Sequence, residues 1–181
     1  MVTIGFIELN SIARGVETAD IVLKAADTVL LQAKPCCPGK YVILYSGEVA
    51  AVQSAMDAAM QANGSRIIDH TVIPRVHEEV TRAIAQTTQP DILEAVGVME
   101  YFSITAAVYG ADAAAKASEV RLLDVRLGTG IGGKSFVVLT GEVAAVREAV
   151  RCGTKQAREE GLLIEEVVIP SPRPEVIEEL L

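Results

Sequence analysis

The chain carries one sequence pattern in both of its halves, and this repeat constrains the fold more than any other feature. The segment at 4–26 reads IGFIELNSIARGVETADIVLKAA, and the segment at 96–117 reads VGVMEYFSITAAVYGADAAAKA. The pairs that match at one offset are Gly5 and Gly97, Glu8 and Glu100, Ser11 and Ser103, Asp20 and Asp112, and Lys24 and Lys116. GEVAAV then recurs at 47–52 and 141–146, and Ile-Pro recurs at 73–74 and 169–170. The chain is therefore two copies of one unit of about 90 residues, a size that is marginal alone and predicts packing against other units.

Composition and charge exclude several classes of function. Half of the 181 residues are hydrophobic and 4% are aromatic, so we expect a core of Ala, Val, Ile and Leu. The net charge of −8 argues against binding to nucleic acid or to an anionic membrane, since both need a basic surface. No apolar run is long enough for a membrane span, and no signal peptide precedes the first strand. These features predict a cytosolic protein whose cysteines stay reduced.

Each copy is predicted to form the same six elements. Alternating β-rich segments predict strands, and apolar residues recurring every three or four positions predict helices. Strands are expected at 2–9, 28–33, 41–45 and 66–73 and helices at 12–26 and 48–63, then strands at 95–101, 120–127, 135–140 and 162–169 and helices at 103–118 and 142–160. The order β-α-β-β-α-β is the ferredoxin-like arrangement, an α+β sandwich with both helices on one face of an antiparallel sheet.

The repeat also predicts where the domains divide. We expect two tandem domains, 1–87 and 94–181, joined by a linker at 86–91. The tail at 171–181 is Pro-rich and then acidic, which predicts either a surface arm or a disordered segment.

The two copies differ most in the loop before the third strand, where the first copy reads KPCCPGK at 34–40. A disulfide between Cys36 and Cys37 is not expected, because neighbouring Cα atoms lie about 3.8 Å apart and disulfides prefer about 4.4–6.8 Å.

Zinc and iron–sulfur sites need about four ligands, so this loop of one chain is insufficient, whereas a threefold axis could supply one thiolate from each chain. Lys34 and Lys40 flank the loop, and their charge predicts a lowered thiol pKa. The alternative is that both cysteines are merely small loop residues.

Other residue patterns carry weaker signals. The second copy has GTGIGG at 128–133, but a dinucleotide site would need a helix after this motif, and here a strand is expected. His70 is read as a polar residue on the solvent side of a sheet, and His77 as part of a subunit edge. Cys152 is predicted to be a small packed residue of a helix. No catalytic triad, carboxylate pair or phosphate loop is recognisable, so the chain is not expected to be an enzyme.

Several of these motifs together resemble the shell proteins of bacterial microcompartments. They are the opening (I/V)G-x-(I/M)-E, the Asp-x-x-x-Lys elements at 20–24 and 112–116, the Gly-Lys before the third strand, the Gly-Glu-Val of the second helix and the closing Ile-Pro. They occur in order, twice, over almost the whole chain. Within that family the chain most resembles the tandem-domain type, of which three copies form a pseudohexameric tile. The likeness is greatest to the type of propanediol-utilization compartments that binds an iron–sulfur cluster, because Cys37-Pro38-Gly39-Lys40 matches its loop.

The resemblance implies a site and a set of partners. It implies one [4Fe–4S] cluster per homotrimer, with Cys37 as the ligand from each subunit and Cys36 as the alternative. The central pore would be formed by Pro35, Cys36, Cys37, Pro38, Gly39, Gly128, Thr129, Gly130, Ile131 and Gly132. Lys24, Lys116 and Arg75 would lie at the tile edge and contact neighbouring shell proteins. Arg173 is the second copy's candidate for the role of Arg75, since Ser171-Pro172 follows its Ile-Pro.

Three functions remain open at this stage. In the first, the tile lies in the shell of a microcompartment in the cytoplasm and moves electrons across it to or from a redox enzyme or flavoprotein inside. In the second, the pore conducts small polar metabolites and holds no cluster. In the third, the chain is a sensor or enzyme built on a ferredoxin-like fold.

Overall fold

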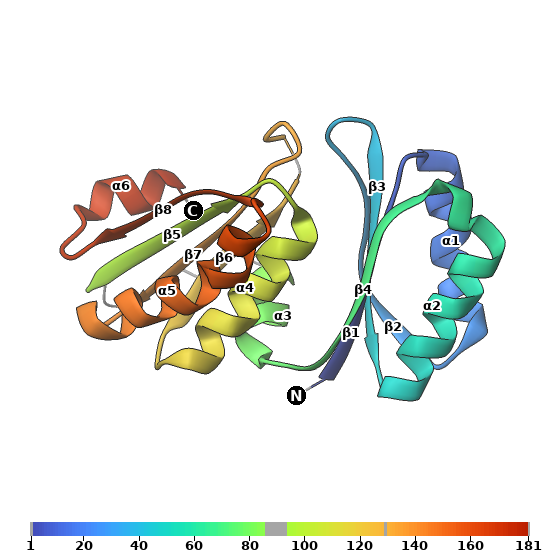
Figure 1. Ribbon diagram of the computed structural model, residues 1–181, viewed down its shortest axis with the longest axis horizontal. Helices are drawn as coiled ribbons and strands as arrows, with labels where there is room; N and C mark the ends of the chain where they lie inside the picture. Colours follow the sequence, from blue (N-terminus) through green and yellow to red (C-terminus); the bar gives the residue numbers. More distant parts are fainter. Residues whose placement is uncertain (1, 86–93, 129, 181) are drawn as a thin grey trace. The chain divides into compact units, whose positions relative to one another are not determined.

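The computed structural model describes residues 2–85, 94–128 and 130–180. The chain forms two compact units, Met1–Val76 and His77–Leu181 (Figure 1). The first contains β1 (Val2–Leu9), α1 (Ile12–Ala25), β2 (Thr28–Cys36), β3 (Lys40–Gly47), α2 (Val49–Asn63), the 3₁₀ turn η1 (Gly64–Arg66) and β4 (Ile67–Val76). The second contains α3 (Glu78–Ala85), β5 (Ala95–Tyr101), α4 (Ile104–Ala117), β6 (Arg121–Leu127), β7 (Ser135–Gly141), α5 (Val143–Glu159), β8 (Leu163–Ile169) and α6 (Pro174–Leu180).

Both units have the predicted ferredoxin-like topology. The strand orders are β2-β3-β1-β4 and β6-β7-β5-β8, with every neighbouring pair antiparallel. Figure 1 shows α1 and α2 together on one face of the first sheet, and α4 and α5 together on one face of the second. The predicted fold class and element order are therefore confirmed.

The two sheets share the register shift in the pairing of their edge strands β2 and β6. In β2 the pairing with β3 shifts between Leu30 and Gln32, and in β6 the pairing with β7 shifts between Leu122 and Asp124. The helices also begin alike, because the side chain of Ser11 accepts a hydrogen bond from the Arg14 amide and that of Ser103 from the Ala106 amide. Such serine caps satisfy an amide that the first turn leaves without a partner.

The division of the chain differs from the predicted boundaries. The units divide between Val76 and His77, because α3 packs against β6 and α4 and so belongs to the second unit. The sequence patterns did not predict α3, nor α6, which forms within the tail at 171–181. The predicted linker at 86–91 lies outside the described residues.

The core of the first unit is built around close approaches to glycine. Ile7, Val22, Ile43 and Tyr45 are fully buried in one cluster with the apolar face of α2. Gly5 makes room for Tyr45: a Cβ at Gly5 would lie 2.2 Å from the ring carbon Cζ. The Tyr45 hydroxyl donates to the Val52 carbonyl oxygen at 3.3 Å, which ties β3 to α2. The glycine is therefore required by packing.

Gly5→Ala is expected to destabilise the chain, because its methyl group overlaps a buried ring that cannot move freely. Overpacking of this kind costs about 1–3 kcal/mol. Gly64→Ala is the matched control, since the nearest atom to a Cβ there is Met60 Cε at 3.9 Å. Urea unfolding followed by circular dichroism measures both variants. Equal midpoints for Gly5→Ala and the wild type would contradict this packing argument.

Candidate functional site

The candidate site is the hairpin that joins β2 to β3. The ladder between the two strands extends to the pair Cys36 and Lys40, so the turn is only Cys37, Pro38 and Gly39. Gly39 has a φ of +77°, which a residue with a Cβ adopts rarely, and the Cys37–Pro38 peptide bond is cis. The predicted loop at 34–39 is therefore shorter than expected, because the strand continues through Lys34 and Pro35.

The two neighbouring thiols lie in different environments. Cys36 is 6% exposed, as the last residue of β2, whereas Cys37 in the turn is half-buried. The pKa of the Cys36 thiol is raised to about 11, first by burial and next by the Glu8 carboxylate, while Lys40 and Lys34 lower it. Both flanking lysines lower the thiol pKa as predicted, but desolvation outweighs their charge, so the pKa of Cys36 is raised overall.

An ion pair at the base of the hairpin explains in part why the pKa of Cys36 is raised despite the nearby lysines. Lys40 Nζ lies 2.7 Å from Glu8 Oε1, and the Glu8 side chain is 8% exposed. The second unit has the same pair, with Lys134 Nζ 2.8 Å from Glu100 Oε1. Lys40 therefore neutralises a buried carboxylate instead of acting on a thiol alone. All four residues occupy repeated positions, so the repeat marks both members of the pair. The sequence alone did not predict that the glutamate and the lysine form an ion pair.

The glycine loop of the second unit occupies the position of the cysteine hairpin. Four of its glycines have left-handed backbone conformations, with φ values of +67° at Gly128, +76° at Gly130, +68° at Gly132 and +85° at Gly133. No atom lies within 4 Å of a Cβ placed on Gly130 or Gly132, so backbone conformation and not crowding requires glycine there. The loop joins β6 to β7, which confirms that the G-x-G-x-x-G motif does not open a helix. Thr129 lies outside the described residues.

The predicted edge residues are exposed and lie on different elements. Lys24 lies in the last turn of α1; its side chain is 75% exposed and Nζ lies 2.6 Å from Asp20 Oδ2. Lys116 lies in the last turn of α4; its side chain is 39% exposed and Nζ lies 2.5 Å from Asp112 Oδ2. Arg75 is exposed in a β-bulge of β4, with a φ of +53° that is uncommon for a residue with a side chain. The edge roles themselves stay predictions.

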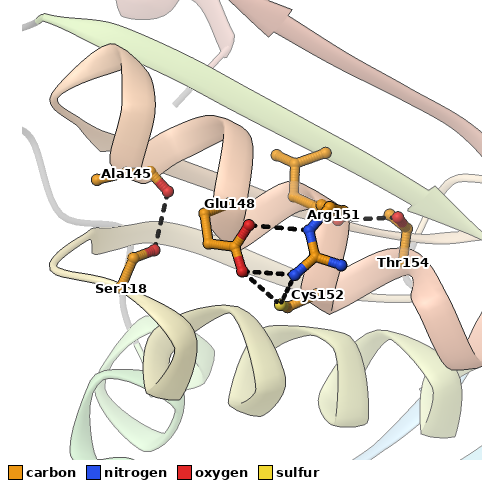
Figure 2. Close-up of polar contacts among 7 residues, drawn as sticks. Ser118, Ala145, Glu148, Arg151, Cys152 and Thr154 are labelled. Atoms are coloured by element: carbon orange, nitrogen blue, oxygen red, sulfur yellow. Dashed lines mark hydrogen bonds and ion pairs between the residues drawn. The ribbon is translucent and has the colours of Figure 1, made fainter.

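Cys152 is packed less simply than predicted. It is half-buried on α5, and its thiol lies 3.3 Å from Glu148 Oε1 and 3.5 Å from Arg151 Nη2 (Figure 2). Arg151 donates two further hydrogen bonds to the Glu148 carboxylate, at 2.8 and 2.6 Å. Burial and the bond to Glu148 raise the pKa of Cys152 against the opposing charge of Arg151. The thiol therefore belongs to a small polar cluster on a helix and stays protonated at neutral pH.

The histidines show no sign of chemistry of their own. His70 is exposed on β4, as predicted for a residue on the solvent side of the sheet. His77 precedes α3, and its Nδ1 accepts a hydrogen bond from the Glu79 amide at 3.3 Å. Among residues 2–85, 94–128 and 130–180, no group of three or more His, Cys, Asp or Glu side chains could hold a metal ion.

Comparisons with known proteins agree with this architecture. The BMC domain family model matches residues 3–76 and again residues 95–172. The bacterial microcompartment shell protein PduT of Citrobacter freundii is 41% identical over 169 residues, which cover 93% of this chain and 92% of PduT. A crystal structure of a microcompartment protein from Desulfitobacterium hafniense DCB matches with a TM-score of 0.94 and 48% identity, over 98% of this chain and 99% of that one. The carboxysome assembly protein CcmO of Synechococcus elongatus is 27% identical over 190 residues, covering 98% of this chain and 68% of CcmO.

The fold, the duplicated motifs and these matches define a tandem shell protein, and the chain belongs to the BMC domain family. Its role is structural: it is a component of the shell of a bacterial microcompartment, and the family is not one of enzymes. None of the described helices is long and apolar enough to cross a membrane.

The difference between the two hairpin thiols predicts a difference in reactivity. With a pKa of about 11, Cys36 is about one part in a thousand thiolate at pH 8, and this fraction rises about tenfold for each further pH unit. We expect iodoacetamide to alkylate Cys36 slowly at pH 8 and much faster at pH 10. Peptide mass spectrometry of Cys37→Ser isolates the Cys36 signal, and rapid alkylation of Cys36 at pH 8 would contradict the burial argument.

Proposed function

We propose that three copies of this chain form a hexamer-like shell tile, and that one Cys37 thiolate from each copy holds a single [4Fe–4S] cluster at its centre. The observation that carries this proposal is the asymmetry between the two units. One chain offers one half-buried thiol in a hairpin turn, and its repeat counterpart is a loop of glycines. A ring of three chains would therefore alternate three thiol hairpins with three glycine loops around its axis.

Uncovered apolar surface on the first unit supports self-association. Ile12 and Val16 of α1 are 45% and 56% exposed, while their counterparts Ile104 and Val108 of α4 are 2% and 0% exposed. Covering two such side chains would stabilise an assembly by on the order of 1 kcal/mol each. A second copy would supply that cover in a ring of three chains, where each chain makes the same head-to-tail contact with the next.

The donor set at the hairpin fits the proposed group. Iron–sulfur clusters are held by Cys thiolates, and a cluster with three protein ligands keeps one iron for an exogenous ligand. Cys37 is the better ligand, because Cys36 is buried and its raised pKa keeps it protonated. The Glu8–Lys40 ion pair fixes the base of the hairpin that carries Cys37. When bound, the cluster supplies one-electron transfer, which suits exchange with a redox enzyme or flavoprotein inside the compartment.

A pore for small polar metabolites, without a cluster, is the second candidate function. It is favoured by the glycine loop, where Gly130 and Gly132 have open space around them and expose backbone rather than side chains. Exposed backbone N–H and C=O groups can hydrogen-bond a passing polar solute. The two functions differ in their dependence on Cys37.

Cys37→Ser is expected to abolish cluster binding, because serine cannot replace the thiolate of each copy. Anaerobic reconstitution with iron and sulfide, followed by iron analysis and visible absorption, should give about four irons per three wild-type chains. Cys36→Ser and Cys152→Ser are matched controls and should keep the visible absorption. Colourless wild-type protein would overturn the cluster and leave the metabolite pore. Colour that survives Cys37→Ser but is lost in Cys36→Ser would reassign the ligand.

Lys24→Ala and Lys116→Ala test the proposed tile edge. The exposed Lys24–Asp20 pair contributes about 0.3–0.5 kcal/mol, so in Lys24→Ala the melting temperature and the size of the soluble assembly should hardly change. Lys116→Ala also removes the cation beside the 10% exposed Asp112 and should lower the melting temperature more. The loss of contacts between tiles should instead reduce the formation of extended sheets, seen by electron microscopy. Lys155→Ala, at another exposed lysine of a helix, is the control. Sheets that form as readily from Lys24→Ala and Lys116→Ala as from the control would remove the edge role.

A further inference from the structure

The helix α3, which follows the first BMC domain in sequence, covers an edge strand of the second unit. Glu79 Oε2 accepts a hydrogen bond from the Leu122 amide of β6 at 3.2 Å. Val80 is 0% exposed, and the His77 amide donates to Asp112 Oδ1 of α4 at 2.8 Å. Edge strands need such cover, because their outward backbone groups otherwise invite pairing with other chains.

A segment with the same spacing follows the second BMC domain. At the offset of 96 that relates the two Ile-Pro motifs, Glu79 corresponds to Glu175, Val80 to Val176 and His77 to Arg173. This segment forms α6. Val176 is 57% exposed where Val80 is buried, and the side chains of Arg173 and Glu175 are 82% and 68% exposed. The docking residues of α3 thus recur on α6 without being buried.

The matching receptor surface is present on the first unit. The shared register makes Leu30 of β2 the counterpart of Leu122, and the matching helices make Asp20 the counterpart of Asp112. Asp20 is 59% exposed where Asp112 is 10% exposed. The next residue of β2, Leu31, is 37% exposed, whereas its counterpart Leu123 is 0% exposed. The first unit therefore exposes the surface that its repeat covers.

We infer that α6 of one copy docks on the β2 edge and the α1 end of a second copy, repeating between chains the contact that α3 makes within one. In this contact the Glu175 carboxylate accepts a hydrogen bond from the Leu30 amide. The Arg173 amide donates a hydrogen bond to the Asp20 carboxylate, and the Val176 side chain becomes buried. A second copy is the fitting occupant, because its first unit exposes Leu31 and Asp20, whose counterparts Leu123 and Asp112 are covered in the second unit. The contact is head-to-tail, and with a threefold rotation it would close the ring proposed above.

Charge complementarity supports this occupant. Arg173 is the counterpart of His77, which lies beside Asp112 in the second unit. In the inferred contact the Arg173 guanidinium therefore lies next to the exposed carboxylate of Asp20, the counterpart of Asp112. The likeness between α3 and α6 ends after their first turns. The counterpart of Ala83, which is 2% exposed in α3, is the charged Glu179 in α6. The contact between copies is therefore made by residues 173–176.

Hydrogen exchange of the assembled full-length chain tests this contact. In Val176→Asp, amides of residues 29–33 should exchange about tenfold faster than in the wild type, because the cover of β2 is lost. Amides of residues 121–125 are the internal control, since α3 still covers β6 in the same chain. Equal exchange of residues 29–33 in the variant and the wild type would overturn the inference.

Charge reversal separates this contact from general weakening of the assembly. Arg173→Glu and Asp20→Lys should each raise the protein concentration at which half of the assembly dissociates, by about tenfold. The double variant Arg173→Glu/Asp20→Lys should recover most of this loss, because the reversed pair attracts again. Analytical ultracentrifugation measures all four proteins. Single variants that match the wild type, or a double variant no better than the singles, would overturn the inference.

The inference shares with the proposed function only the self-association of the chain. Cys37→Ser should lose the visible absorption while residues 29–33 stay protected. Coloured wild-type protein with unprotected β2 amides would overturn the α6 contact alone. Protected β2 amides in colourless wild-type protein would overturn the cluster alone.

Discussion

The antiparallel pairing of β2 with β3 continues to its last pair, Cys36 with Lys40, and this pairing decides the chemistry of the hairpin. It leaves Cys36 in the sheet, where desolvation keeps the thiol neutral, and it leaves Cys37 as the first residue of the turn. The Glu8–Lys40 ion pair and its repeat, Glu100–Lys134, secure the same point in both units.

The repeat made most of the fold predictable. Each element is encoded twice, so a weak pattern in one copy is supported by its counterpart, and the observed strands and helices begin and end within a few residues of the predicted positions. The helices α3 and α6 escaped prediction because they are short, and helices of this length depend on tertiary contacts more than on their own sequence. The boundary between the units lies at Val76–His77 for the same reason: α3 packs on β6 and α4 of the second unit, and this packing is not visible in the sequence.

The candidate site was predictable in its residues but not in its electrostatics. Sequence shows that Lys34 and Lys40 flank the cysteines, and proximity alone favours a lowered pKa. It does not show that Lys40 reaches a buried carboxylate or that Cys36 is enclosed by the sheet. Both facts depend on strand pairing between residues that are far apart in the chain. The glycine loop shows the same limit, because its residue types alone do not reveal that four of its glycines adopt left-handed backbone conformations.

The different second turns of α3 and α6 have a mechanical consequence for a ring of three chains. The proposed ring would have two kinds of joint: within a chain the docked helix α3 belongs to a continuous peptide chain, whereas between chains one turn of α6 would dock without such a tether. Under load or dilution the untethered joints open first. Each chain in such a ring takes part in two untethered joints, so a whole chain with its single hairpin thiol leaves the tile only when both of them open.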